Sequence, residues 1–242
     1  MNQRILLILS GLAFAVFTAC SSGESSSEEA TTEAEPEVVE TETMANEWQD
    51  LSSLEAWRNY KADTLSEKWK MEGEAITLVE KGGGTIVTKE EYDNFELEME
   101  WKISEGGNSG LFFNVIETDE VGPAWHSGPE YQLLDNERHQ DAQIRKHRAG
   151  DNYDVQQSTV ETVKPAGEWN TTRLVVNGDQ VEHYLNGEKV VEYELGSPAW
   201  QDSVAASKFG ELPMYGKADQ GHIALQDHGD KVWFRNIRIR EI

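Results

Sequence analysis

The chain has 242 residues, and its 21 Lys and Arg stand against 45 Asp and Glu, giving a formal charge of −24. This balance argues against a nucleic-acid partner and against binding to anionic lipid surfaces, because both need clustered basic side chains. Cys20 is the only cysteine. Without an intramolecular disulfide, the fold must be held together by its own hydrophobic core.

The first element in chain order is a secretion signal. Arg4 precedes an apolar run over residues 5–17, which is too short to span a membrane and typical of a signal peptide. The run ends in Phe17-Thr-Ala-Cys20, which resembles a bacterial lipobox although Phe17 stands where Leu is usual. We predict a lipoprotein signal peptide over residues 1–19 and lipidation of Cys20. The alternative is an ordinary secretory signal followed by an incidental cysteine.

Residues 20–46 are predicted to form a disordered acidic tether. They contain eight Glu and no Lys or Arg, and such a composition buries too little apolar surface to offset the entropy lost on ordering. Residues 47–242 carry 37 acidic and 20 basic side chains, a charge near −17. We expect one folded domain there, secreted and held at the periplasmic or cell-surface side of the bacterial envelope. The lipid is its only expected membrane contact.

From residue 47 onward, short strand patterns are separated by Gly, Asn and Asp, and strong helical periodicity is missing. Residues 95–103 alternate strictly between apolar and charged side chains, which is typical of an antiparallel strand with one buried face. Asn177-Gly178 and Asn186-Gly187 predict tight hairpin turns between strands at 173–177, 181–185 and 189–195. Other strands are expected at 75–79, 85–88, 111–116 and 232–240. The pattern predicts an all-β jelly-roll sandwich.

Two further strands, 128–136 and 221–229, carry polar side chains where a simple core strand would be apolar. Glu130 and Gln132 share a face of the first, and Gln226 and His228 share a face of the second. Two long polar loops, 136–160 and 196–221, follow or precede these strands. Loops of this length on a compact β scaffold usually carry function. We therefore expect both strands to line a polar groove beneath the loops.

Glu130 and His228 are the candidates for acid or base chemistry. Glu130 can act as a base or accept hydrogen bonds from sugar hydroxyls; the alternative is a solvent-facing Glu such as Glu98. His228 stands just before Gly229, where it can act as a general base near neutral pH. Its alternative is a turn histidine bonded to the backbone.

Three cations in the long loops, Lys208, His147 and Arg148, can polarise a carbonyl or neutralise an oxyanion, or simply pair with nearby carboxylates. Asp135 and Asn136 are followed by His139 and Asp141, which together could form a metal cluster, but their spacing matches no defined metal loop. We favour a turn stabilised by Asp and Asn side chains.

The tryptophans are candidates for stacking on sugar rings. Trp125 and Trp200 lie in predicted loops and are the better candidates for such a platform. Trp101, Trp169 and Trp233 are expected in the core because of the strand periodicity around them.

Several motifs occur in an order that resembles the 3-keto-disaccharide hydrolase family. The resemblance covers residues 48–242 and implies a concanavalin A-like jelly roll and a carbohydrate substrate, a glycoside already oxidised to a ketone at C3. The residues that carry it are Gly107-Asn-Ser-Gly110, Glu130-Tyr-Gln-Leu-Leu-Asp-Asn136, His147-Arg-Ala-Gly150 with Tyr153-Asp154, Gly167-Glu-Trp-Asn170, Tyr184-Leu-Asn-Gly187, Ser207-Lys-Phe209 and Gly221-His-Ile-Ala-Leu-Gln-Asp-His-Gly229 with Phe234-Arg-Asn-Ile237.

The chemistry that the resemblance implies is β-elimination rather than displacement. A C3 ketone acidifies the C2 hydrogen, so one base and a set of enolate-stabilising donors suffice, and added water completes a net hydrolysis. Glu130 and His228 are expected as acid/base partners in unassigned order. No metal ligands are assigned, and the sequence leaves open whether a divalent cation is required. Substrate binding or enolate stabilisation is expected from Asn108, Gln132, Asp135, His147, Arg148, Lys208 and Gln226, with Trp125 as the sugar platform.

Two alternatives remain beside this reading. One is a non-catalytic carbohydrate-binding lipoprotein on the same fold. The other is a conventional glycosidase that uses Glu130 together with Glu98 or Glu100, which needs the two carboxyls about 5–10 Å apart across one cleft.

Overall fold

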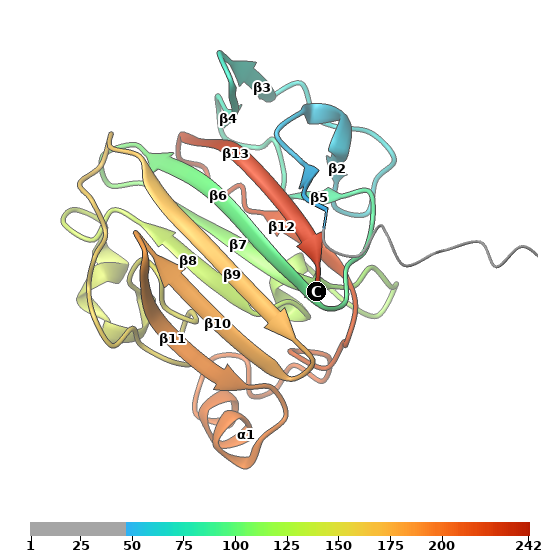
Figure 1. The fold of residues 1–242 in the computed structure, drawn as a ribbon, viewed down its shortest axis with the longest axis vertical. Helices are drawn as coiled ribbons and strands as arrows, with labels where there is room; N and C mark the ends of the chain where they lie inside the picture. The colour runs from blue at the N-terminus through green and yellow to red at the C-terminus, as the bar shows by residue number, and fades with distance from the viewer. Residues whose placement is uncertain (1–46) are drawn as a thin grey trace, which may run out of the picture. The chain divides into compact units, whose positions relative to one another are not determined.

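The computed structural model describes residues 47–242, and the predicted signal peptide, lipidated Cys20 and tether lie outside this range. Within it, two antiparallel sheets form a sandwich (Figure 1). The larger sheet has the strand order β11-β10-β9-β6-β13-β4-β3, with β1 paired to β13. Its strands are β1 Gln49–Asp50, β3 Trp69–Glu72, β4 Ala75–Leu78, β6 Phe95–Ile103, β9 Asn170–Asn177, β10 Gln180–Leu185, β11 Glu188–Glu194 and β13 Val232–Glu241.

The smaller sheet has the order β2-β5-β12-β7-β8. Its strands are β2 Trp57–Asn59, β5 Ile86–Thr88, β7 Asn108–Val115, β8 Glu130–Leu134 and β12 His222–Leu225. In Figure 1, β7 and β8 lie behind the larger sheet. One α-helix, α1 (Pro198–Ala205), and four short 3-10 helices lie between the strands: η1 Leu54–Ala56, η2 Ala124–His126, η3 Gln140–Gln143 and η4 Arg145–His147.

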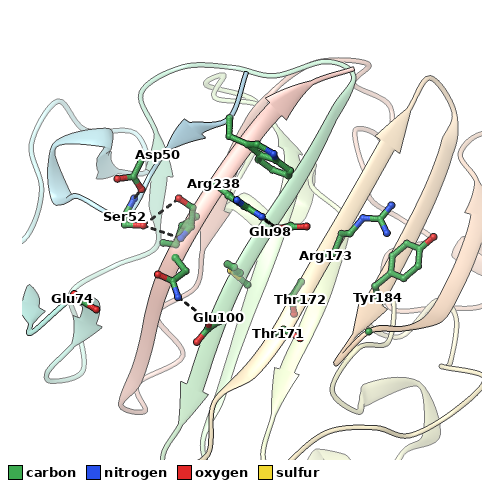
Figure 2. A pocket seen from close by; sticks show the side chains of 15 residues that line it. Asp50, Ser52, Glu74, Glu98, Glu100, Thr171, Thr172, Arg173, Tyr184 and Arg238 are labelled. Carbon is green, nitrogen blue, oxygen red and sulfur yellow. Dashed lines mark hydrogen bonds and ion pairs between the residues drawn. The ribbon is translucent and has the colours of Figure 1, made fainter. Parts of the chain in front are cut away.

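The core lies between the two sheets and follows the alternation of the sequence. On β6 the apolar residues from Phe95 to Ile103 are buried in one cluster with Leu111 of β7 and Tyr131 of β8. Glu98 and Glu100 lie on the opposite, outer side of the larger sheet (Figure 2). The predicted all-β sandwich of two antiparallel sheets is confirmed.

The hairpins of the larger sheet follow the turn residues, with one shift. Asn186 and Gly187 both have positive φ (52° and 90°), as a tight Asn-Gly turn requires. The other turn is formed by Gly178-Asp179 instead of Asn177-Gly178, because β9 continues through Asn177 and β10 begins at Gln180. Gly178 still supplies the positive φ of that turn, 56°.

Four expectations, about one loop and three tryptophans, are wrong. Residues 196–221 contain α1, and its Trp200 is buried between the rings of Tyr193 and Tyr215 instead of offering a sugar platform. Trp169 and Trp233 are half-buried under cationic side chains instead of lying in the core. Trp101 is buried as expected.

The strand predicted over 221–229 is shorter than expected, because β12 ends at Leu225. The Asp227 carboxylate accepts hydrogen bonds from the backbone of Gly82 and Gly84 at 2.9 and 2.8 Å and from Gly229 at 2.8 Å. These bonds hold the segment in an irregular path, so His228 lies beyond the sheet. The helices of residues 47–242 are all too short or too polar to cross a membrane.

Candidate functional site

The outer face of the smaller sheet carries the polar residues that the sequence singled out. The register pairs Gly110 with Gln132 and Phe112 with Glu130 across β7 and β8. Their neighbours Leu111 and Tyr131 point into the core, so these four residues face outward. The Gln226 backbone N–H donates to the Gly110 carbonyl at 2.9 Å, which places Gln226 beside β7 on the side opposite β8.

Buried polar atoms without a partner gather here. Asn108 Oδ1, Gln132 Nε2 and Gln226 Oε1 are buried and make no hydrogen bond to any group within residues 47–242. Leaving a buried polar atom unsatisfied costs about 1–3 kcal/mol, and nearly all such atoms in folded proteins have partners. An amide donor and two amide acceptors are therefore available to a polar ligand.

The Glu130 carboxyl lies among these amides with 4% of the residue exposed. It lies directly over Gly110, where an added Cβ would come within 2.2 Å of Glu130 Oε1. Burial raises the pKa of the Glu130 carboxyl to about 8; the positive charge of Lys208 opposes the rise and the negative charge of Asp141 adds to it. Glu130 is consequently protonated at neutral pH and can donate a proton.

Lys208 approaches from the segment after α1. Its ammonium lies over the ring of Tyr153 at 4.2 Å from the centroid, over Phe209 at 5.0 Å and over Trp125 at 5.3 Å. The Lys208 backbone N–H donates to the Asp154 carboxylate at 2.7 Å. A cation held against aromatic faces is positioned to meet negative charge on a substrate.

The loop over residues 136–160 supports this arrangement from the other side. Tyr153 donates a backbone hydrogen bond to the Glu130 carbonyl at 3.0 Å, and its hydroxyl donates to Asp141 at 3.2 Å. The His147 ring stacks on Tyr153 at 4.2 Å and lies 2.9 Å from the Asp154 carboxylate. His147 therefore holds the loop in place by stacking on Tyr153 and contacting Asp154.

His228 lies just past β12, and 46% of its side chain is exposed. Its ring packs against His139 at 6.2 Å, and its Nδ1 is 4.0 Å from the Asp230 carboxylate. Burial lowers the pKa of the His228 imidazole, although Asp230 partly opposes this. The ring is neutral at pH 7 and can accept a proton. The charges of Lys208 and Asp141 shift the pKa values of both His228 and Glu130. Both residues therefore lie within reach of the same two charged side chains.

Asp135 and Arg148 are engaged by groups of the protein itself. The Asp135 carboxylate accepts from the backbone of Gly106 at 2.7 Å and of Glu137 at 3.0 Å. Arg148 donates to the Ala142 carbonyl at 2.9 Å and pairs with Glu161, just after the loop. Their predicted contact with substrate stays a prediction, while their observed role is to shape the turn and loop.

Sequence reasoning missed Tyr153 and Asp141 as members of the site. Tyr153 belonged to a recognised motif but carried no sign of its proximity to Glu130. Asp141 follows Asp135 in the sequence as part of a possible metal cluster, and nothing there indicates its contact with Tyr153. Within residues 47–242, no three His, Cys, Asp or Glu side chains are grouped so that they would hold a metal ion.

Glu98 and Glu100 lie on the outer face of the other sheet (Figure 2). Glu98 accepts from Arg238 at 2.9 Å, and Glu100 accepts from Arg235 at 2.7 and 2.8 Å. Packed sheets are about 10 Å apart, and Glu130 points away from the core on the opposite side. A glycosidase pair of Glu130 with Glu98 or Glu100 is therefore ruled out by the sandwich.

Comparison with known proteins agrees with this architecture. The sequence profile of a family described as the 3-keto-alpha-glucoside-1,2-lyase-like domain matches residues 44–240. A Bacteroides thetaiotaomicron protein named 3-keto-disaccharide hydrolase is 37% identical, in a match that covers 79% of this chain and 76% of that protein.

Solved structures show the same fold. A Parabacteroides distasonis protein proposed to be a glycosyl hydrolase is 30% identical with a TM-score of 0.73, covering 81% of this chain and 94% of that one. A Bacillus subtilis protein with a galectin-like fold is 14% identical with a TM-score of 0.51, covering 81% and 96%. The second likeness concerns the fold alone.

Proposed function

This chain belongs to the 3-keto-alpha-glucoside-1,2-lyase-like family and is an enzyme of that family; from this premise we propose that it cleaves the glycosidic bond of 3-keto-disaccharides and other 3-keto-glycosides. The observation that carries the proposal is the neutral Glu130 among three unpartnered amide atoms. Such a set suits an uncharged, hydroxyl-rich substrate, because amides both donate to and accept from hydroxyls.

The proposed mechanism is elimination followed by hydration. His228, neutral at pH 7, removes the proton at C2, which the C3 ketone acidifies. The electron pair moves into a C2–C3 enolate, whose oxygen the Lys208 ammonium stabilises. As the C3 carbonyl re-forms, the C1–O bond breaks to give a C1–C2 double bond, and Glu130 protonates the leaving oxygen. Water then adds its hydroxyl to C1 and a proton to C2.

The assignment of acid and base follows from the two environments. Burial raises the pKa of the Glu130 carboxyl to about 8 and lowers the pKa of the His228 imidazole. Near neutral pH, Glu130 therefore holds a proton that His228 lacks. Two titratable groups whose surroundings push their pKa values apart are suited to opposite roles.

The test compares a 3-keto-glucoside with its unoxidised parent, in deuterated water. We expect release of the aglycone from the keto form only, with one deuterium at C2 of the sugar product, corrected for exchange in an enzyme-free control. Glu130→Gln and His228→Gln should each lower kcat by about a hundredfold or more. Release from the parent compound, or a product without deuterium at C2, would contradict elimination. Binding without turnover would indicate a carbohydrate-binding protein instead.

We further propose that Cys20 carries a lipid and that residues 20–46 tether the enzyme to the bacterial envelope. The support is in the sequence: an apolar run ending at the sole cysteine, then an acidic segment without Lys or Arg. On this proposal the domain is secreted and touches the membrane only through its lipid, on the periplasmic or cell-surface side.

A further inference from the structure

The outer face of the larger sheet has a hollow of about 830 Å³ that the proposed reaction does not use (Figure 2). It crosses β6, β9, β10 and β13 and reaches the start of the domain at Trp48. None of the residues around Glu130 or His228 lines it. The core of the sandwich separates this hollow from the proposed active site.

Charged side chains in the hollow are held in fixed pairs. Glu98 Oε2 accepts from Nε and Nη2 of Arg238, and Arg173 Nε donates to Glu96. Within residues 47–242, Glu98 Oε1, Arg238 Nη1 and both Nη atoms of Arg173 make no hydrogen bond. The free carboxylate oxygen can accept a hydrogen bond, and the free guanidinium N–H groups can donate in their plane. Such a set can bind pairs of neighbouring hydroxyls.

Aromatic rings stand at two places in the hollow. The Arg238 guanidinium lies 4.4 Å from the centroid of the Trp48 ring, and the Arg173 guanidinium lies 4.2 Å from that of Tyr184. Each stack fixes both its ring and its guanidinium, so little side-chain entropy is lost when a ligand binds.

The lining also narrows the class of ligand. Four carboxylates, those of Asp50, Glu74, Glu98 and Glu100, outnumber the guanidinium groups of Arg173 and Arg238, which disfavours uronic-acid or sulfated chains. The unused guanidinium N–H groups disfavour cations. A protein partner would need a dehydrated apolar centre, whereas the aromatic rings here lie beneath charged groups.

We propose that this hollow is a second, non-catalytic carbohydrate site that binds a neutral oligosaccharide chain. It lies on the opposite face of the sandwich from Glu130, so it binds glycan independently of turnover.

The test is native affinity electrophoresis of the full chain in mild detergent, in gels containing dextran, starch, mixed-linkage β-glucan, galactomannan or, as an anionic control, pectin. We expect retardation in at least one neutral gel. The double variant Arg173→Ala/Tyr184→Ala should raise the apparent Kd by about tenfold or more, since it removes a charged donor and a ring. Trp233→Ala is the matched control: this aromatic residue is on the same face but outside the hollow, and its variant should be retarded like the wild type.

Glu130→Gln should also be retarded normally, because that residue lies on the other face. The proposal is overturned if no neutral gel retards the protein, if pectin alone does, or if Glu130→Gln abolishes retardation while the double variant keeps it. Sedimentation could instead show a concentration-dependent dimer that the double variant disrupts. Together with no retardation in any gel, that result would assign the hollow to a second copy of the chain.

Discussion

The Glu130 carboxyl has Gly110 beneath it and opposing charges nearby, Lys208 and Asp141. Its surroundings favour the neutral form because burial removes water from a group that needs solvation when ionised. The same environment that prepares a proton donor therefore makes the folded state sensitive to pH.

We predict that Glu130 destabilises the fold as pH rises from about 4.5 to about 8. In this window the unfolded chain has released the Glu130 proton while the folded chain retains it, so the free energy of unfolding falls with pH. Each pKa unit corresponds to about 1.4 kcal/mol, so the loss has an upper bound of a few kcal/mol. The measurement is the Tm of wild type and Glu130→Gln between pH 5 and pH 9. The Tm of the variant should increase relative to that of the wild type as pH rises. Parallel curves of Tm against pH would contradict the raised pKa of Glu130.

The pairing of β7 with β8 makes a glycine necessary at position 110. An added Cβ would come within 2.2 Å of Glu130 Oε1 and 2.9 Å of its Cδ, so the carboxyl would have to move. We expect Gly110→Ala to lower kcat by about ten- to a hundredfold, because small displacements of reacting groups have effects of this size.

The control for this prediction is the same substitution in a Glu130→Gln background. If Gly110 acts through the position of Glu130, Gly110→Ala should add little to the loss already caused by Glu130→Gln. Independent, multiplying losses would show that Gly110 matters for another reason, such as the pairing of the strands.

Asp154 connects the two long loops. Its carboxylate accepts from the Lys208 backbone at 2.7 Å and lies 2.9 Å from His147 Nε2, and its carbonyl accepts from Lys146 at 2.6 Å. Its φ of 59° is in the left-handed region, which Asp tolerates better than most residues. The two loops therefore hold Lys208 and Tyr153 in register through one side chain.

We predict that Asp154→Ala lowers kcat about tenfold or more while the sandwich stays folded, since Lys208 loses its anchor. Hydrogen exchange should accelerate in residues 206–212 and not in the strands. Asp179→Ala, an exposed Asp in the β9–β10 turn, is the matched control and should change neither quantity. Unchanged exchange in 206–212 would show that Lys208 is held by its aromatic contacts alone.

At the scale of the whole molecule, the outer faces of the two sheets carry different chemistry. One has unpartnered amides around a neutral carboxyl, and the other has ion pairs stacked on aromatic rings. The enzyme is thus expected to act on one face and to bind glycan on the other.

We predict that Cys20→Ser moves the protein from the membrane fraction to the soluble fraction, because the substitution removes the only expected anchor. Mass spectrometry of the N-terminal peptide should find a lipid on Cys20 of the wild type. Glu130→Gln, expressed in the same way, should stay with the membrane. A soluble wild-type protein with an unmodified cysteine would favour the ordinary secretory signal.

Much of the fold followed from local patterns. Alternation over residues 95–103 and the Asn-Gly turns predicted strands and hairpins, because side-chain period and positive φ are properties of neighbouring residues. The end of β12 did not follow, since Asp227 bonds to glycines more than 140 residues away in the sequence. α1 escaped prediction because it is short and only weakly amphipathic.

The sequence by itself determined that Glu130 and Gln132 share a face, because residues two apart on a strand always do. It also determined the family, through motifs in a fixed order. Only the tertiary structure decided that Glu130 and Glu98 face away from each other across the core, since strand alternation does not say which sheet a strand joins. Tertiary packing alone also brings Lys208, Tyr153 and Asp141 to the site and removes water from Glu130, which changes a carboxylate into a proton donor.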